Sequence, residues 1–199
     1  MPDGNPLSPV MLQDAHVTLE PLTLDHVPAL ERVATDGELW KLWFTSVPAP
    51  GGMAAYVEAA LRGQVEGHML PFVVRERAGN GIVGCTRYCH YDRAVPRIEI
   101  GYTWYAKSWQ RSRVNTHCKY LLLDYAFQGL ACSAVELRTD RYNQVSQRAI
   151  ERLGAQRDGI LRAHMRRADG SLRDTVVYSI TASDWPDVQR LLAWKMDRS

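Results

Sequence analysis

The hydrophobic and polar positions change their spacing once between Arg97 and Tyr125. Apolar side chains alternate with polar or small ones up to Trp104, which is typical of a strand with one face in a core. From Val114 the apolar positions follow the three-and-four spacing of a helix face. We expect one face of the strand to carry Ile98, Ile100, Tyr102 and Trp104, and the other Arg97, Glu99, Gly101 and Thr103.

A polar loop, residues 107–113, joins the predicted strand to the predicted helix. No acidic side chain occurs between Ile100 and Leu123, whereas Lys107, Arg111, Arg113 and Lys119 do. A helix N-terminus offers unpaired N–H groups and a partial positive charge. This order of elements therefore predicts a binding site for an anion such as a phosphate group.

The remaining pattern predicts further strands and helices on both sides of this stretch. A long helical connection between the strands near 97 and 135 requires them to run parallel, while short turns make the other pairs antiparallel. The fold class is therefore α/β with a mixed sheet. Strands are predicted at 17–21, 71–76, 81–88, 135–139, 160–167 and 174–181, and helices at 25–34, 53–61, 114–126 and 147–153, the last ended by Gly154.

Composition is that of one ordinary globular domain, with 199 residues, 46% hydrophobic and a net charge of +2. We expect a flexible leader over 1–15, a domain over 16–182 and a helical tail over 183–199. The four cysteines form no CxxC motif, and no stretch resembles a signal or membrane segment, so a cytoplasmic protein is expected. Arginines between 148 and 167 alternate with acids, which indicates a solvated face and no nucleic-acid partner.

Two segments carry a resemblance to a known family. The segments IEIGYTWYAKSWQRSRVNTHCKYLLLDYAF and VELRTDRYNQVSQRAIERLGA resemble the GNAT superfamily of N-acetyltransferases, in its RimJ/RimL-like branch. The resemblance covers roughly residues 15–182. It implies a mostly antiparallel sheet of about seven strands, splayed between its fourth and fifth strands, with helices on both faces and acetyl-CoA in the split.

The resemblance also implies roles for particular residues. Backbone near Thr103, Trp104 and Tyr105 would pair with the pantetheine of CoA, and Asn143 and Ser146 would lie near the thioester. The phosphate loop departs from the usual pattern, because Arg113 and Asn115 stand where small residues are common. The other cofactor-binding residues expected are Gln110, Arg111, Ser112, Val114, Thr116 and Arg148.

Acetyl transfer to an amine requires a proton acceptor near the amine and a proton for the thiolate. Glu99 is the candidate base, through a raised pKa or a bridging water; the alternative is a structural salt bridge to an arginine. Ser146 is the candidate proton donor, and its alternative role is the N-cap of its helix. Asn143 completes the catalytic set. His117 is expected to be a cap or surface residue.

The acceptor side is expected to include the aromatic residues that precede the cofactor strand, together with Tyr102 and His164. Trp40, Trp43 and Phe44 have a core position as their alternative. A metal site from Cys85, Cys89 and His90 is not expected, because neighbours on a strand point to opposite faces. The chain is expected to be a monomer or homodimer. A non-catalytic CoA-binding sensor is the alternative function.

Overall fold

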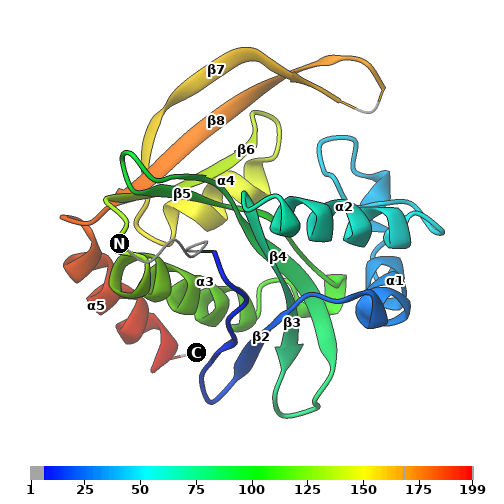
Figure 1. Cartoon of the computed structure of the whole chain (residues 1–199), viewed down its shortest axis with the longest axis horizontal. Helices are drawn as coiled ribbons and strands as arrows, with labels where there is room; N and C mark the ends of the chain where they lie inside the picture. Colours follow the sequence, from blue (N-terminus) through cyan, green and yellow to red (C-terminus); the bar gives the residue numbers. More distant parts are fainter. Residues whose placement is uncertain (1–6, 168, 199) are drawn as a thin grey trace.

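The computed structural model describes residues 7–167 and 169–198. Its centre is one open sheet of eight strands in the order β1-β2-β3-β4-β5-β6-β8-β7 (Figure 1). All neighbouring strands are antiparallel except β5 and β6, which are parallel, so the predicted mixed sheet is confirmed. The strands are β1 Leu12–Gln13, β2 Val17–Pro21, β3 Met69–Glu76, β4 Ile82–Asp92, β5 Arg97–Tyr105, β6 Ala134–Asp140, β7 Gln156–Arg166 and β8 Leu172–Thr181.

The sheet opens between its two parallel strands. β5 and β6 pair only where Arg97–Glu99 lie beside Ala134–Glu136, although β5 continues to Tyr105 and β6 to Asp140. Beyond this short ladder, the facing backbone edges of the two strands carry no strand-to-strand pairing in the described chain. The expected splay of the sheet is therefore present between β5 and β6, beyond Glu99.

Helices cover both faces of the sheet, as predicted (Figure 1). One core packs the sheet against α3, α4 and α5, and a second core packs its other face against α1 and α2. The helices are α1 Val27–Thr35, α2 Met53–Val65, α3 Val114–Asp124, α4 Gln144–Glu151 and α5 Trp185–Met196; the π-helical turn η4 Tyr125–Gly129 extends α3, and 3-10 turns lie at η1 Leu24–His26, η2 Leu39–Lys41 and η3 Lys107–Trp109.

Both ends of the described chain pack onto the domain. The expectation of a flexible leader over 1–15 is wrong from residue 7 onward, since Leu7 is buried and β1 pairs with β2; residues 1–6 lie outside the described residues. The predicted C-terminal helix is present as α5, and Trp185 and Leu192 are buried in the core that contains α3.

Two non-glycine residues in the central strands have left-handed backbone, and both change which face a side chain occupies. Tyr102 has φ 52° and His90 has φ 53°, each within an irregularity of the β4–β5 pairing. After the bulge at Tyr102, Trp104 lies in the second core, opposite to Ile98 and Ile100. The predicted shared face of these residues is therefore wrong, because a β-bulge breaks the period of two.

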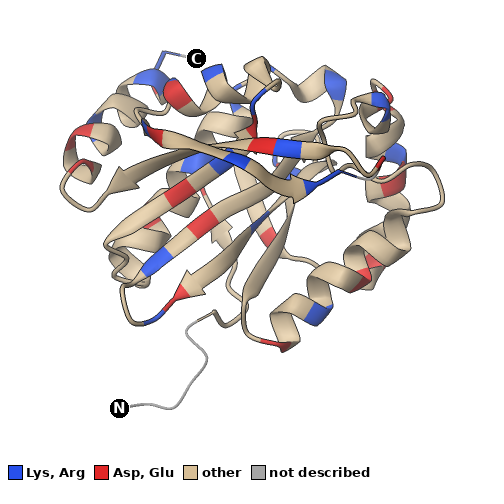
Figure 2. Cartoon of the chain, turned by 90° about the horizontal axis from the view of Figure 1, so that it is seen from above, with Lys and Arg blue, Asp and Glu red and all other residues tan. Residues whose placement is uncertain are grey.

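Charged residues of both signs are spread over the strands and helices (Figure 2). The arginines for which a solvated face was expected are exposed at 148, 152, 157, 162 and 166. Arg167 is the exception, since its side chain is only 9% exposed and pairs with buried Asp140. The four cysteines are buried and free. In the part of the chain that the structure describes, every helix is too short or too polar to cross a lipid bilayer.

Candidate active site

Glu99 is the carboxylate at the point where β5 and β6 separate. Its side chain is 10% exposed, and Oε2 lies 3.0 Å from His90 Nδ1 and 3.4 Å from Arg138 Nε. Oε1 points along β5 toward Gly101, where a Cβ atom would stand only 3.0 Å from it. One oxygen of Glu99 is thus held by two neighbours, and the absence of a side chain at Gly101 leaves room for the other.

A cavity of about 190 Å³ opens beside this carboxylate. Its second buried acid, Glu136, is bound by Arg97 and by Arg138, whose Nη2 lies 2.6 Å from Glu136 Oε2. Burial raises the pKa of Glu136, but the bonds from the two arginines outweigh it and lower the pKa overall. The bond to Glu99 raises the pKa of His90. The lining residues are His90, Asp92, Arg97, Ile98, Glu99, Glu136 and Arg138.

The geometric argument against a metal at Cys89 and His90 is wrong. The left-handed backbone of His90 places its ring on the face of Cys89 and Glu99, and the ligand atoms of these three residues lie within 4.8 Å of one another. Burial raises the pKa of the Cys89 thiol well above its usual range, so the group remains protonated at neutral pH. Sequence alternation alone could not have found the contact between His90 and Glu99.

The predicted phosphate loop lies between β5 and α3. Arg113 is the N-cap residue of α3, with right-handed φ −63° and ψ −24°, and Asn115 lies within the helix. Neither position therefore needs the conformational freedom of glycine. The left-handed residue of the loop is instead Arg111, with φ 64°.

Two side chains of the loop form hydrogen bonds with backbone atoms in or next to the loop. Ser112 Oγ accepts a hydrogen bond from Val114 N at 3.3 Å, and Gln110 Nε2 donates one to Tyr105 O at 3.2 Å. The exposed Arg113 lies 3.4 Å from His16 Nδ1. The loop leads directly into α3 at Val114, so the predicted order of strand, loop and helix is present, and an anion site at this helix start stays a prediction.

Behind β5 lies a buried lysine that the sequence analysis counted only with the basic residues near the loop. Lys119 on α3 donates a hydrogen bond to Thr103 Oγ1 at 2.7 Å, and this oxygen also bonds Thr86 Oγ1 at 2.7 Å. Burial lowers the pKa of Lys119 to about 8. The ammonium group therefore supports β5 from the face that carries α3.

His117, expected to be a cap or surface residue, is buried. Its Nδ1 lies 2.6 Å from Asp14 Oδ2, and its ring contacts His16 edge-on. Burial raises the pKa of Asp14, but bonds from the backbone of Val17 and His16 and from His117 lower it overall. This contact attaches the N-terminal segment to α3 beside the loop.

The Asn143-to-Ser146 segment begins α4 at the end of β6. Asn143 is the N-cap, and its Oδ1 accepts a hydrogen bond from Ser146 N at 3.0 Å. The alternative role of Ser146 as the N-cap is therefore wrong. Arg148 is exposed on the same helix.

This cap allows a matched test of the two residues. Asn143→Ala should lower the free energy of unfolding by about 1 kcal/mol, because a helix N–H loses its acceptor. Ser146→Ala should change it by less than about 0.5 kcal/mol. Urea denaturation of both variants measures the difference, and a Ser146→Ala cost equal to that of Asn143→Ala would contradict the assignment of the cap.

On the other face of the sheet, Trp43 is 54% exposed rather than part of the core. Its ring contacts Tyr142 at 5.5 Å between centroids and the Arg167 guanidinium at 4.8 Å. Trp40 and Phe44 are partly buried, and neither belongs to the two buried cores. His164 is exposed on β7, with Nδ1 3.1 Å from Thr175 Oγ1. The loop with Trp43 thus meets the residues that follow β6 and β7.

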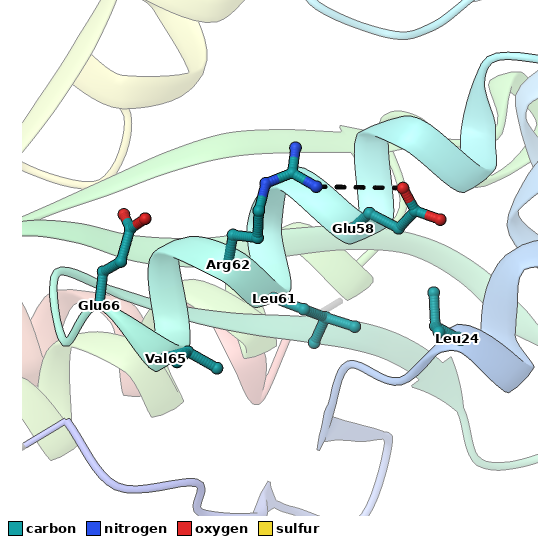
Figure 3. A pocket seen from close by; sticks show the side chains of 6 residues that line it. All are labelled: Leu24, Glu58, Leu61, Arg62, Val65 and Glu66. Carbon is teal, nitrogen blue, oxygen red and sulfur yellow. Dashed lines mark ion pairs between the residues drawn. The ribbon is translucent and has the colours of Figure 1, made fainter.

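A larger cavity, of about 340 Å³, lies away from this chemistry on the outer side of α2 (Figure 3). Its charged members are Glu58 and Arg62, which pair with each other at 3.9 Å, and Glu66. Nothing in it resembles a proton acceptor held near the split of the sheet. Glu99 is therefore the buried carboxylate that lies at the split of the sheet, and this larger cavity lies elsewhere.

Comparison with known proteins decides the family. The domain described as "Acetyltransferase (GNAT) domain" matches residues 16–156. The chain belongs to the GNAT acetyltransferase family. A GNAT enzyme of this kind is an acyl-CoA-dependent acyltransferase, and the resemblance predicted from the sequence is confirmed.

Individual GNAT relatives span nearly the whole chain. N-acetyltransferase p20 of Bacillus licheniformis, itself uncharacterized, is 24% identical over 179 residues, which are 87% of this chain and 97% of the relative. A GCN5-related N-acetyltransferase from Brucella melitensis is 26% identical with a TM-score of 0.84, covering 95% and 86% of the two chains. RimJ of Mycobacterium smegmatis, solved in complex with CoA-disulfide, has the same fold, with 21% identity, a TM-score of 0.79 and coverage of 96% and 97%.

Proposed function

We propose that this GNAT enzyme transfers the acetyl group of acetyl-CoA to a primary amine, by direct attack within a ternary complex. The observation that carries the proposal is the placement of Glu99. It is a buried carboxylate at the split of the sheet, with Oε2 held by His90 and Arg138 and Oε1 directed toward Gly101. A fixed acceptor with one available oxygen is what proton removal from an amine requires.

The chain offers groups that fit CoA along one continuous path. The open edge of β5 would pair with the pantetheine near Thr103 to Tyr105, and the loop 110–116 at the start of α3 would hold the pyrophosphate. Arg113 and Asn115 have right-handed backbone, so a phosphate loop can form here without small residues at these two positions. Arg113 would add a charged contact to phosphate oxygens.

In the proposed reaction the amine nitrogen attacks the thioester carbon, and the C–S bond breaks. The amine proton passes to Glu99, directly or through a water, and the thiolate of CoA takes a proton from the Ser146 hydroxyl or from solvent. His90 and Arg138 keep Glu99 in position throughout. Asn143 holds the start of α4, so it orients Ser146 rather than exchanging a proton.

Coenzyme A should stabilise the folded protein, because a ligand bound only by the native state shifts unfolding by mass action. At about 100 times the dissociation constant the expected gain is about 2.7 kcal/mol. Thermal unfolding with and without acetyl-CoA measures it. An unchanged Tm at saturating acetyl-CoA would contradict CoA binding.

Catalysis is tested separately by thiol release. Incubation with acetyl-CoA and a panel of primary amines should release free CoA thiol in proportion to acetylated amine, which mass spectrometry identifies. A protein that gains stability from CoA but acetylates none of the amines would contradict the proposed reaction while leaving the binding site in place.

A further inference from the structure

Arg173 on β8 is a half-buried guanidinium without a close counter-ion. Its nearest carboxylate oxygen among the described residues is Asp140 Oδ2, at 3.8 Å from Nε, and this buried Nε has no hydrogen-bond partner in the described chain. Burial lowers the pKa of Arg173. A buried N–H group of a cation that has no hydrogen-bond acceptor is costly, so the arrangement of Arg173 Nε requires an explanation.

The one carboxylate in reach of Arg173 is already occupied. Arg167 donates to Asp140 Oδ2 twice, from Nε at 3.0 Å and from Nη2 at 2.8 Å, and the Asp140 side chain is fully buried. Two guanidinium groups therefore share one carboxylate, and the closer one binds it. A positive charge remains on Arg173.

Arg173 lies on the face of the sheet that carries Glu99. On β8 Ser179 stands opposite Glu136, and the pairing with β6 continues without a break to Thr175. Arg173 is two residues further along the same strand, so its side chain leaves the same face. Its charge acts on Glu99 and on the ring of Tyr102, which places it on the acceptor side of the proposed reaction.

A second guanidinium, without a carboxylate partner among the described residues, belongs to β4, the neighbour of β5 on the edge away from β6 and β8. Arg87 on β4 is 4% exposed and lies over the rings of Tyr102, at 4.0 Å, and Tyr56, at 4.7 Å. Its one hydrogen bond in the described chain is to Met69 Sδ at 3.6 Å, and no carboxylate of the described residues pairs with it. The left-handed backbone of Tyr102 brings its ring under Arg87.

The neighbouring arginines show that this shortage of acids is local. Arg97 and Arg138 are both paired with Glu136, and Arg138 also reaches Glu99. The positive charges near Glu99 are thus matched by carboxylates, whereas those near Tyr102 are not. A site with one cation that shares its carboxylate with Arg167 and a second cation that has no ion pair among the described residues is suited to an anion brought by a ligand.

We propose that the acceptor amine carries an oxyanion group, a carboxylate or a phosphate, which Arg173 binds beside Tyr102 while Arg87 adds positive potential. The inference rests on the proposed amine acetylation and names its substrate class. Arg173 would be a specificity-determining residue, since its planar fork matches both kinds of oxyanion.

The test compares acceptors that differ in this one group. Three pairs serve, namely L-alanine and L-alaninamide, phosphoethanolamine and ethanolamine, and a peptide amide with Asp or Asn as its second residue. The measured quantity is kcat/KM, expressed per concentration of neutral amine. We expect the oxyanion member of at least one pair to be preferred by about tenfold to hundredfold, the range of a bond to a charged group. The responding pair distinguishes carboxylate from phosphate.

Variants of Arg173 test whether this residue causes the preference for the acceptor with the oxyanion group. Arg173→Gln should reduce the preference to about twofold or less, and Arg173→Lys should retain part of it. Because the charge of Arg173 also acts on Glu99, the result is the ratio of kcat/KM between the two members of a pair, in which an effect on the base is common to both. Arg162→Gln is the control, because Arg162 is 74% exposed and pairs with Asp174; its preference should equal that of the wild type. If Arg173→Gln does not fold, the reduced preference of Arg173→Lys decides.

Each other outcome overturns a defined part of the proposal. Equal kcat/KM within all three pairs would overturn the oxyanion subsite and leave amine acetylation standing. A preference that survives in Arg173→Gln and Arg173→Lys would overturn the assignment to Arg173. Absence of turnover with both members of every pair, in a protein that binds CoA, would refute the proposed function and this inference with it.

Discussion

Glu99→Gln is expected to lower turnover by about 100-fold to 10,000-fold, the range typical of removing a general base. The amide retains the shape of the carboxylate and can still accept one hydrogen bond, but it cannot take the amine proton. CoA affinity should hardly change, because the Glu99 side chain lies beside His90 and Arg138, four residues before Thr103, where the pantetheine is proposed to pair with β5. Steady-state kinetics and a CoA titration separate the two effects.

The loss should become smaller as pH rises. More acceptor amine is then neutral before it binds, so less of the reaction depends on the carboxylate. Glu58→Gln is the matched control, since Glu58 is a 54% exposed carboxylate on α2 that pairs with Arg62. Full activity of Glu99→Gln across the pH range would make Glu99 structural, with positioning of the two substrates as the source of catalysis.

The strand, loop and helix around the active site were predictable because each follows a periodic pattern. The change in spacing near residue 107 separates β5 from α3, and the length of that connection predicts the parallel pairing of β5 with β6. Gly154 was predictable for another reason. Its φ of 100° is favourable only for a residue without a side chain.

The parts that sequence reasoning missed depend on backbone irregularities at ordinary residues. Tyrosine rarely adopts a left-handed conformation, and histidine adopts it too seldom for the sequence to predict it, yet the two bulges at Tyr102 and His90 decide which residues lie beside Glu99. Period-two reasoning therefore placed Trp104 on the wrong face and separated His90 from Cys89. Tertiary packing, which selects the bulges, has no counterpart in the local pattern.

Lys119 was missed although a signal existed. Helical spacing places it on one stripe with Leu122 and Ala126, which are both buried. A lysine on the apolar stripe of a helix indicates a buried cation, and its partner can be sought on the strand beneath.

Lys119→Met is expected to stabilise the folded protein below pH 8. A pKa lowered from 10.5 to about 8 by burial corresponds to roughly 3 kcal/mol of destabilisation. The variant removes this cost and loses the bond to Thr103, which is worth about 1 kcal/mol. A net gain of about 2 kcal/mol near pH 7 should appear in urea denaturation, whereas Lys41→Met, at a 64% exposed position, should change stability by less than about 0.5 kcal/mol.

The pH dependence of this gain gives the sharper test. Below pH 8 Lys119 is protonated in both states, so its full cost is present. Between about 8 and 10.5 the unfolded chain binds a proton that the folded one has released, and the wild-type lysine becomes progressively less destabilising. The advantage of Lys119→Met over the wild type should therefore shrink as pH rises through this window. Taking the difference between the two proteins cancels the opposite effect of Cys85, whose raised pKa favours unfolding at high pH. Cys118 interacts with Lys119, whose charge lowers the pKa of this thiol, so the comparison is read below the pH at which Cys118 titrates.

The same variant shows what the buried ammonium contributes to the active site. Thr103 lies on the strand expected to pair with pantetheine, and Lys119 is bonded to its hydroxyl. If the lysine fixes this strand for the cofactor, Lys119→Met should be more stable yet bind CoA more weakly, a trade of stability for function. A variant that gains stability with CoA affinity unchanged would show that Thr86 alone holds Thr103 in place, and a variant that gains no stability would contradict the cost assigned to the buried charge.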